Sequence, residues 1–218
     1  MKNMTQLVTG EEMKAIETYT IDEAGLPAAV LTEQAAMAAL QVLAAGRFDL
    51  SKVLVLAGLG QNGADGVALA RLLHQAKIPV TLQFVGNVNR ASQSVKEQLK
   101  AAEACGVTRA EKSDFKEPSL IIDAIFGTGL NADLPEGLQK MLKAANHIEN
   151  TVVALDMPTG IDVNTGDSHG AALKAKATIA FGYQKVGTSR SLGKKMAGRV
   201  IVQSAGLITP NDFDFSIQ

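Results

Sequence analysis

The stretch Val53-Leu-Val-Leu-Ala-Gly-Leu-Gly-Gln-Asn-Gly-Ala-Asp-Gly66 decides the fold. Its first five residues form a short, continuous apolar run, which is typical of a parallel strand buried on both faces. A glycine-rich loop is predicted at 58–66, and a helix at 65–76, where apolar side chains line one face. A strand that passes through a glycine-rich turn into a helix indicates a sheet with helical crossovers.

The same alternation continues along the chain. Further strands are predicted at 79–85, 120–124, 151–155, 177–181 and 199–202, with helices at 93–105 and 137–145. Upstream, two helices are predicted at 9–25 and 28–45. We therefore predict one domain over residues 1–218 with a Rossmann-like α/β fold. It would be a three-layer α/β/α sandwich with a mostly parallel sheet and two N-terminal helices. The tail at 211–218 is predicted to be loosely held.

Composition excludes several classes of protein. Lys plus Arg number 21 against 22 Asp plus Glu, and Trp is absent, which disfavours a nucleic-acid partner. A local basic patch remains open around Lys185, Arg190, Lys194 and Lys195. Cys105 is the only cysteine, so a disulfide framework and a thiolate metal cluster are excluded. Residues 1–10 are polar, and no apolar run approaches a membrane span, so we expect a cytoplasmic protein without membrane attachment.

Three predicted strands run into long loops that combine glycines with aspartates, at 58–66, 123–133 and 156–167. Because the carboxyl ends of parallel strands meet at one edge of a sheet, these loops are expected to form one ligand site. Asp123 and Asp156 each end an apolar strand, where a carboxylate loses solvation and needs a partner. Each could instead serve only as a helix cap or turn residue.

The first loop matches G-x-G-x-x-G at Gly58, Gly60 and Gly63. The dinucleotide fingerprint also needs an acid about 20 residues further on to hold the ribose, and the second strand ends without one. An ordinary NAD-dependent oxidoreductase is therefore disfavoured. The alternative reading is that these glycines serve only a tight turn and close helix packing.

Four ordered motifs resemble the NAD(P)H-hydrate epimerase family, whose domain is also called the YjeF N-terminal type. They are Gln61-Asn-Gly-Ala-Asp-Gly66, Asp123-Ala-Ile-Phe-Gly-Thr-Gly-Leu130, Asp156-Met-Pro-Thr-Gly-Ile161 and Phe181-Gly-Tyr-Gln-Lys-Val-Gly187. The segment 20–35 is also similar, so the resemblance covers nearly the whole chain. Gln61, Ala64 and Thr159 depart from the family pattern, which usually has Asn, Gly and Ser there.

The resemblance implies epimerisation of the R and S forms of hydrated NADH or NADPH at C6 of the nicotinamide ring. Two routes stay open. In one, the hydroxyl leaves to give an iminium and water adds to the other face; in the other, the ring opens to an aldehyde and recloses inverted. Both need a positioned acid–base group. The resemblance implies Asp156 as that group. It implies substrate contacts at Gln61, Asn62, Gly63, Ala64, Asp65, Gly127, Thr128, Gly129, Leu130, Asn131, Ala132, Asp133 and Asp156. Lys185 is either a charge near the phosphates or a solvated surface side chain.

By the same resemblance, Asn62, Asp123 and Thr159 would bind one potassium ion per subunit. Their oxygen donors suit a hard cation, and the alternative is a hydrogen-bond cluster without metal. A homodimer to which the two N-terminal helices contribute, and a separate dehydratase acting on the product, are further implications. Related domains also occur as non-catalytic binding or scaffold modules, which is the competing hypothesis.

Overall fold

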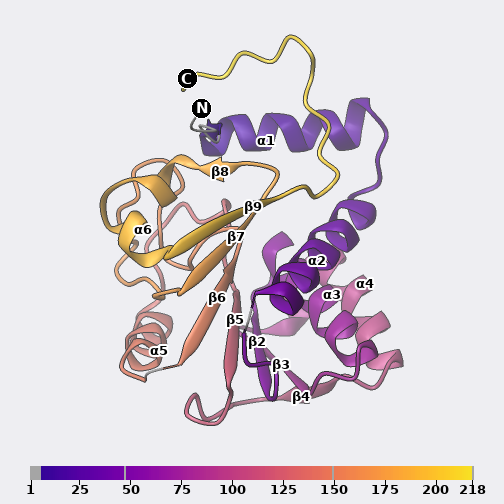
Figure 1. The fold of residues 1–218 in the computed structure, drawn as a ribbon, viewed down its shortest axis with the longest axis vertical. Helices are drawn as coiled ribbons and strands as arrows, with labels where there is room; N and C mark the ends of the chain where they lie inside the picture. Colours follow the sequence, from indigo (N-terminus) through magenta and orange to yellow (C-terminus); the bar gives the residue numbers. More distant parts are fainter. Residues whose placement is uncertain (1–5, 47, 149, 218) are drawn as a thin grey trace.

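A seven-stranded parallel sheet forms the centre of the molecule (Figure 1). The computed structural model describes residues 6–46, 48–148 and 150–217. The strand order is β4-β3-β2-β5-β6-β7-β9. The strands are β2 (Val53–Ala57), β3 (Val80–Phe84), β4 (Thr108–Ala110), β5 (Leu120–Ala124), β6 (Thr151–Leu155), β7 (Ala177–Phe181) and β9 (Arg199–Gln203).

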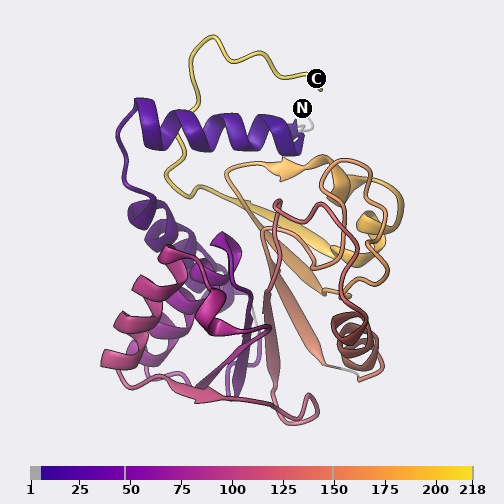
Figure 2. The same cartoon turned by 180° about the vertical axis from the view of Figure 1, so that it is seen from behind.

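Helices cover both faces of this sheet, which gives the predicted α/β sandwich (Figures 1 and 2). On one face, side chains of α2 (Ala28–Ala45), α3 (Gln61–Gln75) and α4 (Gln93–Ala104) share a core with the strands. On the other face, α5 (Glu136–Asn146) packs against the sheet through Leu142 and Ala145. Because both faces are covered, β2 and β5 are buried at every position, as their apolar sequences predicted.

The sheet reverses its direction of growth between β2 and β5. From β2 the chain adds β3 and β4 on one side, and then crosses to place β5 on the other side of β2. The loops that follow β2 and β5 therefore lead away from each other. In open parallel sheets, ligands bind in the crevice that forms at such a point, outside the carboxyl ends of the strands.

The loop predicted at 58–66 is largely helix, because α3 begins at Gln61. Glycine in a helix costs about 1 kcal/mol relative to alanine, which made this glycine-rich run look like a loop. Here the glycines allow close packing. A Cβ on Gly63 would lie 2.1 Å from the carbonyl oxygen of Gly58, and one on Gly66 would lie 2.4 Å from the Cβ of Ala124. Close approach to the sheet thus outweighs helix propensity.

The N-terminal region also differs from its prediction. Thr9 caps α1 (Gly10–Thr18) with Glu12 completing the capping box, but the helix then widens into the π-helical turn η1 (Tyr19–Glu23). Before it, the short strand β1 (Leu7–Val8) pairs in parallel with β8 (Gln184–Lys185), an unpredicted ribbon. Four further short elements were not predicted, β4, η2 (Val88–Arg90), η3 (Val186–Ser189) and α6 (Ser191–Met196). The polar start expected at 1–10 lies outside the described residues over 1–5.

Two other expectations need correction. The tail is held in place: Phe215 packs on Tyr183 with ring centroids 5.6 Å apart, and the backbone N–H of Ser216 donates to Glu12. Among the described residues, α2 is the one helix long and apolar enough to cross a membrane by length and composition, although no such run was expected. One side of α2 nevertheless lies in the sheet core, through Ala35, Ala39 and Leu43.

Candidate functional site

A pocket of about 640 Å³ opens at the carboxyl edge of the sheet, at the point where the strand order reverses. Its walls come from α1, the start of α2, the start of α3, the loop after β5 and the end of β6. In Figures 1 and 2, α1 crosses beyond the carboxyl ends of the strands and closes this side of the molecule. The pocket therefore lies between the sheet edge and α1.

The first turn of α3 forms one wall, with Gly60, Gln61, Asn62 and Asp65 lining the pocket. A Cβ at Gly60 would meet nothing within 4 Å, so this helix N-terminus faces open space. Gln61 Nε2 donates to Thr32 Oγ1 at 2.7 Å and to Asp65 Oδ1 at 3.5 Å. Burial, followed by the nearby charges of Asp156 and Glu17, raises the pKa of Asp65 well above its usual value.

The loop after β5 forms a second wall through Gly127, Thr128 and Gly129. Gly127 sits between two predicted site residues: a Cβ there would lie 3.1 Å from Asp156 Oδ2 and 3.4 Å from Asn62 Cγ. A Cβ at Gly129 would meet nothing within 4 Å. The small residues therefore leave room for a ligand beside the Asp156 carboxylate.

Asp156 faces the pocket at the end of β6, and its backbone is in the left-handed region with φ of 64°. Such a conformation is unusual for a residue with a side chain, although Asp adopts it more readily than most. Its N–H donates to the Ile179 carbonyl at 2.7 Å, which holds the turn against β7. Strained backbone of this kind often marks functional positions.

Lys185 was predicted either to add charge near the phosphates or to lie in solvent, and the second alternative is wrong. Its side chain is 0% exposed, and its ammonium forms an ion pair with Asp156 Oδ1 while donating to the Phe181 carbonyl at 2.9 Å. The patch left open around Lys185 accordingly excludes this residue. Asp156 itself remains 13% exposed toward the pocket. The sequence offered one signal for the importance of Lys185, which is its place in the motif Phe181–Gly187. A motif does not indicate that a lysine side chain is buried.

Asp123 and Thr159 lie together beneath the pocket floor, and both side chains are fully buried. Asp123 Oδ1 accepts from the Thr159 hydroxyl at 2.6 Å, and Oδ2 accepts from the Thr159 N–H at 2.8 Å. Burial outweighs these hydrogen bonds and raises the pKa of Asp123 to about 6. Both amide atoms of Asn62 are buried without a hydrogen-bond partner among the described residues.

Sequence reasoning missed one acidic residue of the site. Glu17 of α1 lines the pocket and is half-buried. Burial and then the charge of Asp156 raise the pKa of Glu17 to about 7, although Lys185 opposes the shift. The sequence contained no signal for this, because Glu17 belongs to a helix that was predicted to contribute to a homodimer and not to the site.

The other predicted substrate residues do not line this pocket. Gly63 and Ala64 are buried in α3, Leu130 is buried below the loop, and Asn131 and Ala132 are exposed. The Asp133 side chain is 83% exposed, and its Oδ1 lies 3.8 Å from His169 Nδ1.

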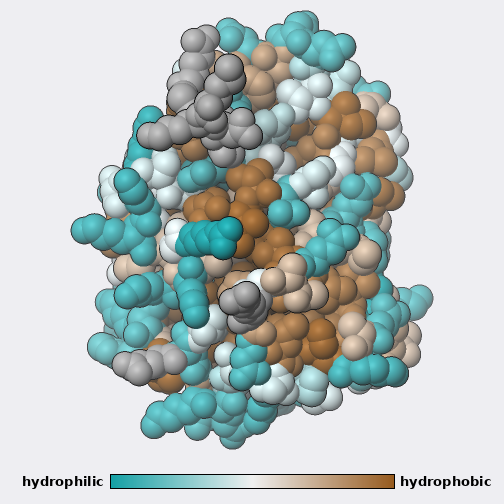
Figure 3. Space-filling model, in the orientation of Figure 1, coloured by the Kyte–Doolittle hydropathy of each residue, from teal (hydrophilic) through white to brown (hydrophobic). Residues whose placement is uncertain are grey.

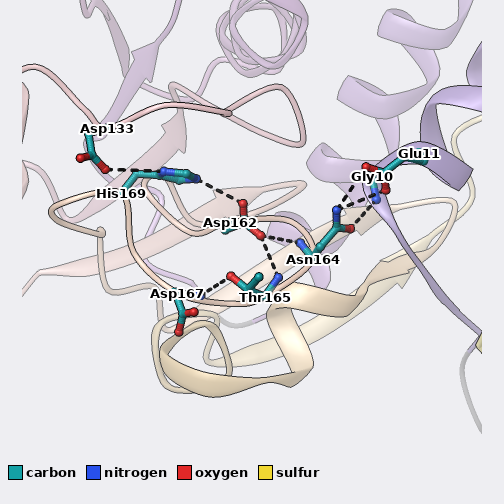
Figure 4. Close-up of polar contacts among 8 residues, drawn as sticks. All are labelled: Gly10, Glu11, Asp133, Asp162, Asn164, Thr165, Asp167 and His169. Carbon is teal, nitrogen blue, oxygen red and sulfur yellow. Dashed lines mark hydrogen bonds and ion pairs between the residues drawn. The ribbon is translucent and has the colours of Figure 1, made fainter.

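Figure 4 follows a set of polar contacts from Asp133 to α1. His169 Nε2 lies 3.3 Å from Asp162 Oδ2, and Asp162 Oδ1 accepts from the N–H of Asn164 at 2.9 Å. The Asn164 side chain then accepts from the N–H of Gly10 at 2.8 Å and donates to Glu11. The loop that follows Asp156 is thus fastened to the first turn of α1.

Comparison with known proteins relates this chain to a described family. A family model for the YjeF-related protein N-terminus matches residues 28–187. A protein named NAD(P)H-hydrate epimerase from Leuconostoc mesenteroides is 60% identical over 99% of this chain and 97% of its own length. One of the same name from Weissella koreensis is 47% identical over 95% of this chain and 94% of its own.

Structural comparison agrees at the level of the fold. The crystal structure of the yeast protein ynu0 covers 95% of this chain and 91% of its own, with a TM-score of 0.79 and 19% identity. The similarity therefore extends over the sheet, the helices on its two faces and the pocket edge. With the family model matching well over half of the residues, the chain belongs to the YjeF-related protein N-terminus family.

Proposed function

We propose that this chain is an NAD(P)H-hydrate epimerase, an isomerase that interconverts the R and S forms of hydrated NADH and NADPH. The observation that carries the proposal is the 60% identity to a relative of that name over 99% of the chain, together with a pocket that holds Asp156. The reaction would serve the repair of damaged nicotinamide nucleotides. A non-catalytic scaffold is disfavoured because the site carboxylates are present and gathered around one pocket.

Inverting C6 requires that carbon to become planar. Either the ring nitrogen expels the hydroxyl to give an iminium, or deprotonation of the hydroxyl opens the ring to an aldehyde that recloses on the other face. Both routes move a proton at the C6 hydroxyl, so a pocket-facing carboxylate is the group required. Asp156 suits this role because Lys185, the N–H of Phe181 and the turn after β6 fix its position.

The rest of the substrate would occupy the space in front of α3 and the loop after β5. The N-terminus of α3 offers backbone N–H groups that lie before the first helical hydrogen bond and the positive end of the helix dipole, both of which favour a pyrophosphate. Gly60 and Gly129 leave that space open. Of the residues proposed to contact substrate, those that line the pocket are Gln61, Asn62, Asp65, Gly127, Thr128, Gly129 and Asp156.

A potassium ion is proposed beside Asn62, Asp123 and Thr159. The fit rests on the buried Asn62 amide, whose oxygen lacks a partner among the described residues, and on a fully buried carboxylate that a cation would neutralise. When bound, the ion would supply positive charge beneath the pocket. Among the described residues, no group of three or more His, Cys, Asp or Glu side chains is arranged to hold a metal, so the donors here are mostly neutral oxygens.

We propose a cytoplasmic homodimer in which α1 and α2 contribute to the interface, with a separate dehydratase using the product. Val30 and Met37 of α2 are exposed at 36% and 42%. Figure 3 shows hydrophobic surface near the middle of the face that α2 occupies in Figure 1. An exposed apolar helix face is typical of an interaction surface.

The direct test is to incubate the purified protein with R-enriched hydrate and follow the ratio of the epimers by chromatography. The proposal predicts rapid approach to the equilibrium ratio, far faster than in buffer alone. An unchanged ratio, with intact protein and stable substrate, would reject it.

A further inference from the structure

We propose that Glu17 of α1 is a second acid–base group of this site and acts on the face of the nicotinamide ring opposite to Asp156. The inference deepens the proposed epimerase function and rests on it. The geometry supports it: Glu17 and Asp156 line the same pocket, one from α1 and the other from the sheet edge that α1 crosses (Figure 1). A ring bound between these walls would present one face to each carboxyl group.

Glu17 is the pocket carboxyl group that has no polar partner among the residues the structure describes. Asp156 is paired with Lys185, and Asp65 accepts a hydrogen bond from Gln61. Glu17 has no hydrogen bond or ion pair with any other residue that the structure describes. A half-buried carboxyl group in a pocket ordinarily finds a partner, since leaving it without one costs free energy. Substrate would supply that partner.

The charges around Glu17 favour the acid form. The charges of Asp156, Lys185 and Asp65 of α3 all act on it, while Lys14 lines the pocket from its own helix. Burial and the Asp156 carboxylate raise its pKa to about 7, against the opposing effect of Lys185. At neutral pH a large fraction of Glu17 therefore carries a proton that it can donate. An acid whose pKa lies near the working pH is the most effective proton donor.

The helix that carries Glu17 is anchored to the elements that carry Asp156 and Lys185. At its start, β1 pairs with β8 so that Val8 lies opposite Lys185. Asn164, from the loop after Asp156, accepts from the N–H of Gly10. Past its end, the Thr20 hydroxyl accepts from the N–H of Ile208 at 3.0 Å. These ties on both sides of Glu17 hold its position relative to Asp156.

Inversion by the iminium route needs a proton on one face and a proton acceptor on the other. Glu17 gives its proton to the departing C6 hydroxyl, which leaves as water while the ring nitrogen lone pair forms the C–N double bond. A second water then adds to C6 from the opposite face and loses a proton to the Asp156 carboxylate. The nitrogen recovers its lone pair. Solvent returns the proton from Asp156 to Glu17, so atoms and charges balance. The other epimer reacts by the same steps in reverse.

The test compares Glu17→Gln with Glu23→Gln, a matched control at an exposed position on the neighbouring turn that does not line the pocket. Glutamine preserves size but cannot donate this proton. We expect turnover of the hydrate by Glu17→Gln to fall about 10²-fold or more, while Glu23→Gln matches wild type. Wild-type turnover should also fall as pH rises through about 7, and Glu17→Gln should lose that dependence. Glu17→Asp, which keeps an acid, should be slower but retain it.

Isotope exchange adds a readout that a purely structural role would not change. In ¹⁸O-labelled water, each epimer can also exchange its C6 hydroxyl without inversion. The hydroxyl leaves as water, and labelled water adds to C6 on the same face. Glu17→Gln should abolish exchange in one epimer and spare it in the other. The proposal would be overturned if Glu17→Gln lost exchange in both epimers to the same extent. It would also be overturned if the turnover of Glu17→Gln stayed within about twofold of wild type with the pH dependence intact. An inactive wild type would instead reject the epimerase function itself.

Discussion

The ammonium of Lys185 is wholly buried and pairs with the Asp156 carboxylate. Of these two side chains, only Asp156 remains partly exposed to the pocket. The pair therefore fixes the orientation of the group proposed to exchange protons with substrate. The second hydrogen bond of Lys185, to the Phe181 carbonyl at the end of β7, ties that orientation to the sheet. A charged side chain this deeply buried requires its partner, because neither charge is stable alone out of water.

Removing the lysine should therefore destabilise the fold as well as the site. For Lys185→Met we expect a loss of about 3–5 kcal/mol in the free energy of unfolding, because Asp156 loses its buried counter-charge. The control is Lys174→Met, at an exposed position, which should change stability by no more than about 0.5 kcal/mol. Denaturant unfolding measures both. Equal stability of the two variants would mean that the pair does not stabilise the native state.

Two glycines of the G-x-G-x-x-G motif should differ sharply when changed to alanine. Gly63→Ala places a Cβ 2.1 Å from the carbonyl oxygen of Gly58, so backbone must shift and the melting temperature should fall clearly. Gly60→Ala meets nothing within 4 Å, so its stability should be near that of wild type. If the space in front of Gly60 holds substrate, its KM should rise. A tolerated Gly63→Ala would contradict the packing described for α3.

Potassium should stabilise the protein most at alkaline pH. Folding raises the pKa of Asp123 from 3.8 to about 6, so its contribution to stability is fully present below about 3.8 and is lost as pH rises through 6. Above that pH the site holds an unneutralised buried carboxylate, which a cation would relieve. We predict that potassium chloride raises the melting temperature more at pH 8 than at pH 5, relative to tetramethylammonium chloride, and that Asp123→Asn loses most of this effect. Identical melting curves in the two salts at pH 8 would argue against the ion site.

The exposed face of α2 should mediate self-association. Light scattering at micromolar concentration should give twice the monomer mass for wild type, and Met37→Asp should shift the population toward monomer because it places a charge on an apolar interface. An exchange at a polar exposed position far from α2, such as Lys174→Asp, should leave the dimer intact. A strictly monomeric wild type would reject the proposed assembly.

Sequence predicts the sheet of this protein better than its active site. The strands at 53–57, 120–124 and 151–155 are buried on both faces, so their apolar runs mark them directly. The start of α3 escaped prediction because glycine is a poor helix former, and the close approaches of Gly63 to Gly58 and of Gly66 to Ala124 explain why glycine occupies these helical positions. Local propensity cannot anticipate a tertiary contact of that kind.

The site was predicted only in part, for a related reason. Asp123 and Asp156 could be identified because one lies at the end of an apolar strand and the other directly follows one. Lys185 and Glu17 could not, because their importance depends on burial and on neighbours distant in the sequence. Glu17 comes from α1, which is held at the pocket by long-range contacts such as the pairing of β1 with β8 and the hydrogen bond from Gly10 to Asn164. No spacing in the sequence indicates that arrangement.

The most direct test of the proposed chemistry is the turnover of R-enriched hydrate by Asp156→Asn beside wild type, with substrate affinity measured in parallel. Asparagine keeps an oxygen to accept from Lys185 and from the N–H of Phe181, but it cannot exchange a proton at the C6 hydroxyl. Because the buried Lys185 loses its counter-charge, some fall in melting temperature is expected, and the assay is made well below it. We expect turnover to fall about 10²–10⁴-fold and substrate affinity to change only a few-fold. Near-normal turnover by the folded variant would contradict the assignment of Asp156.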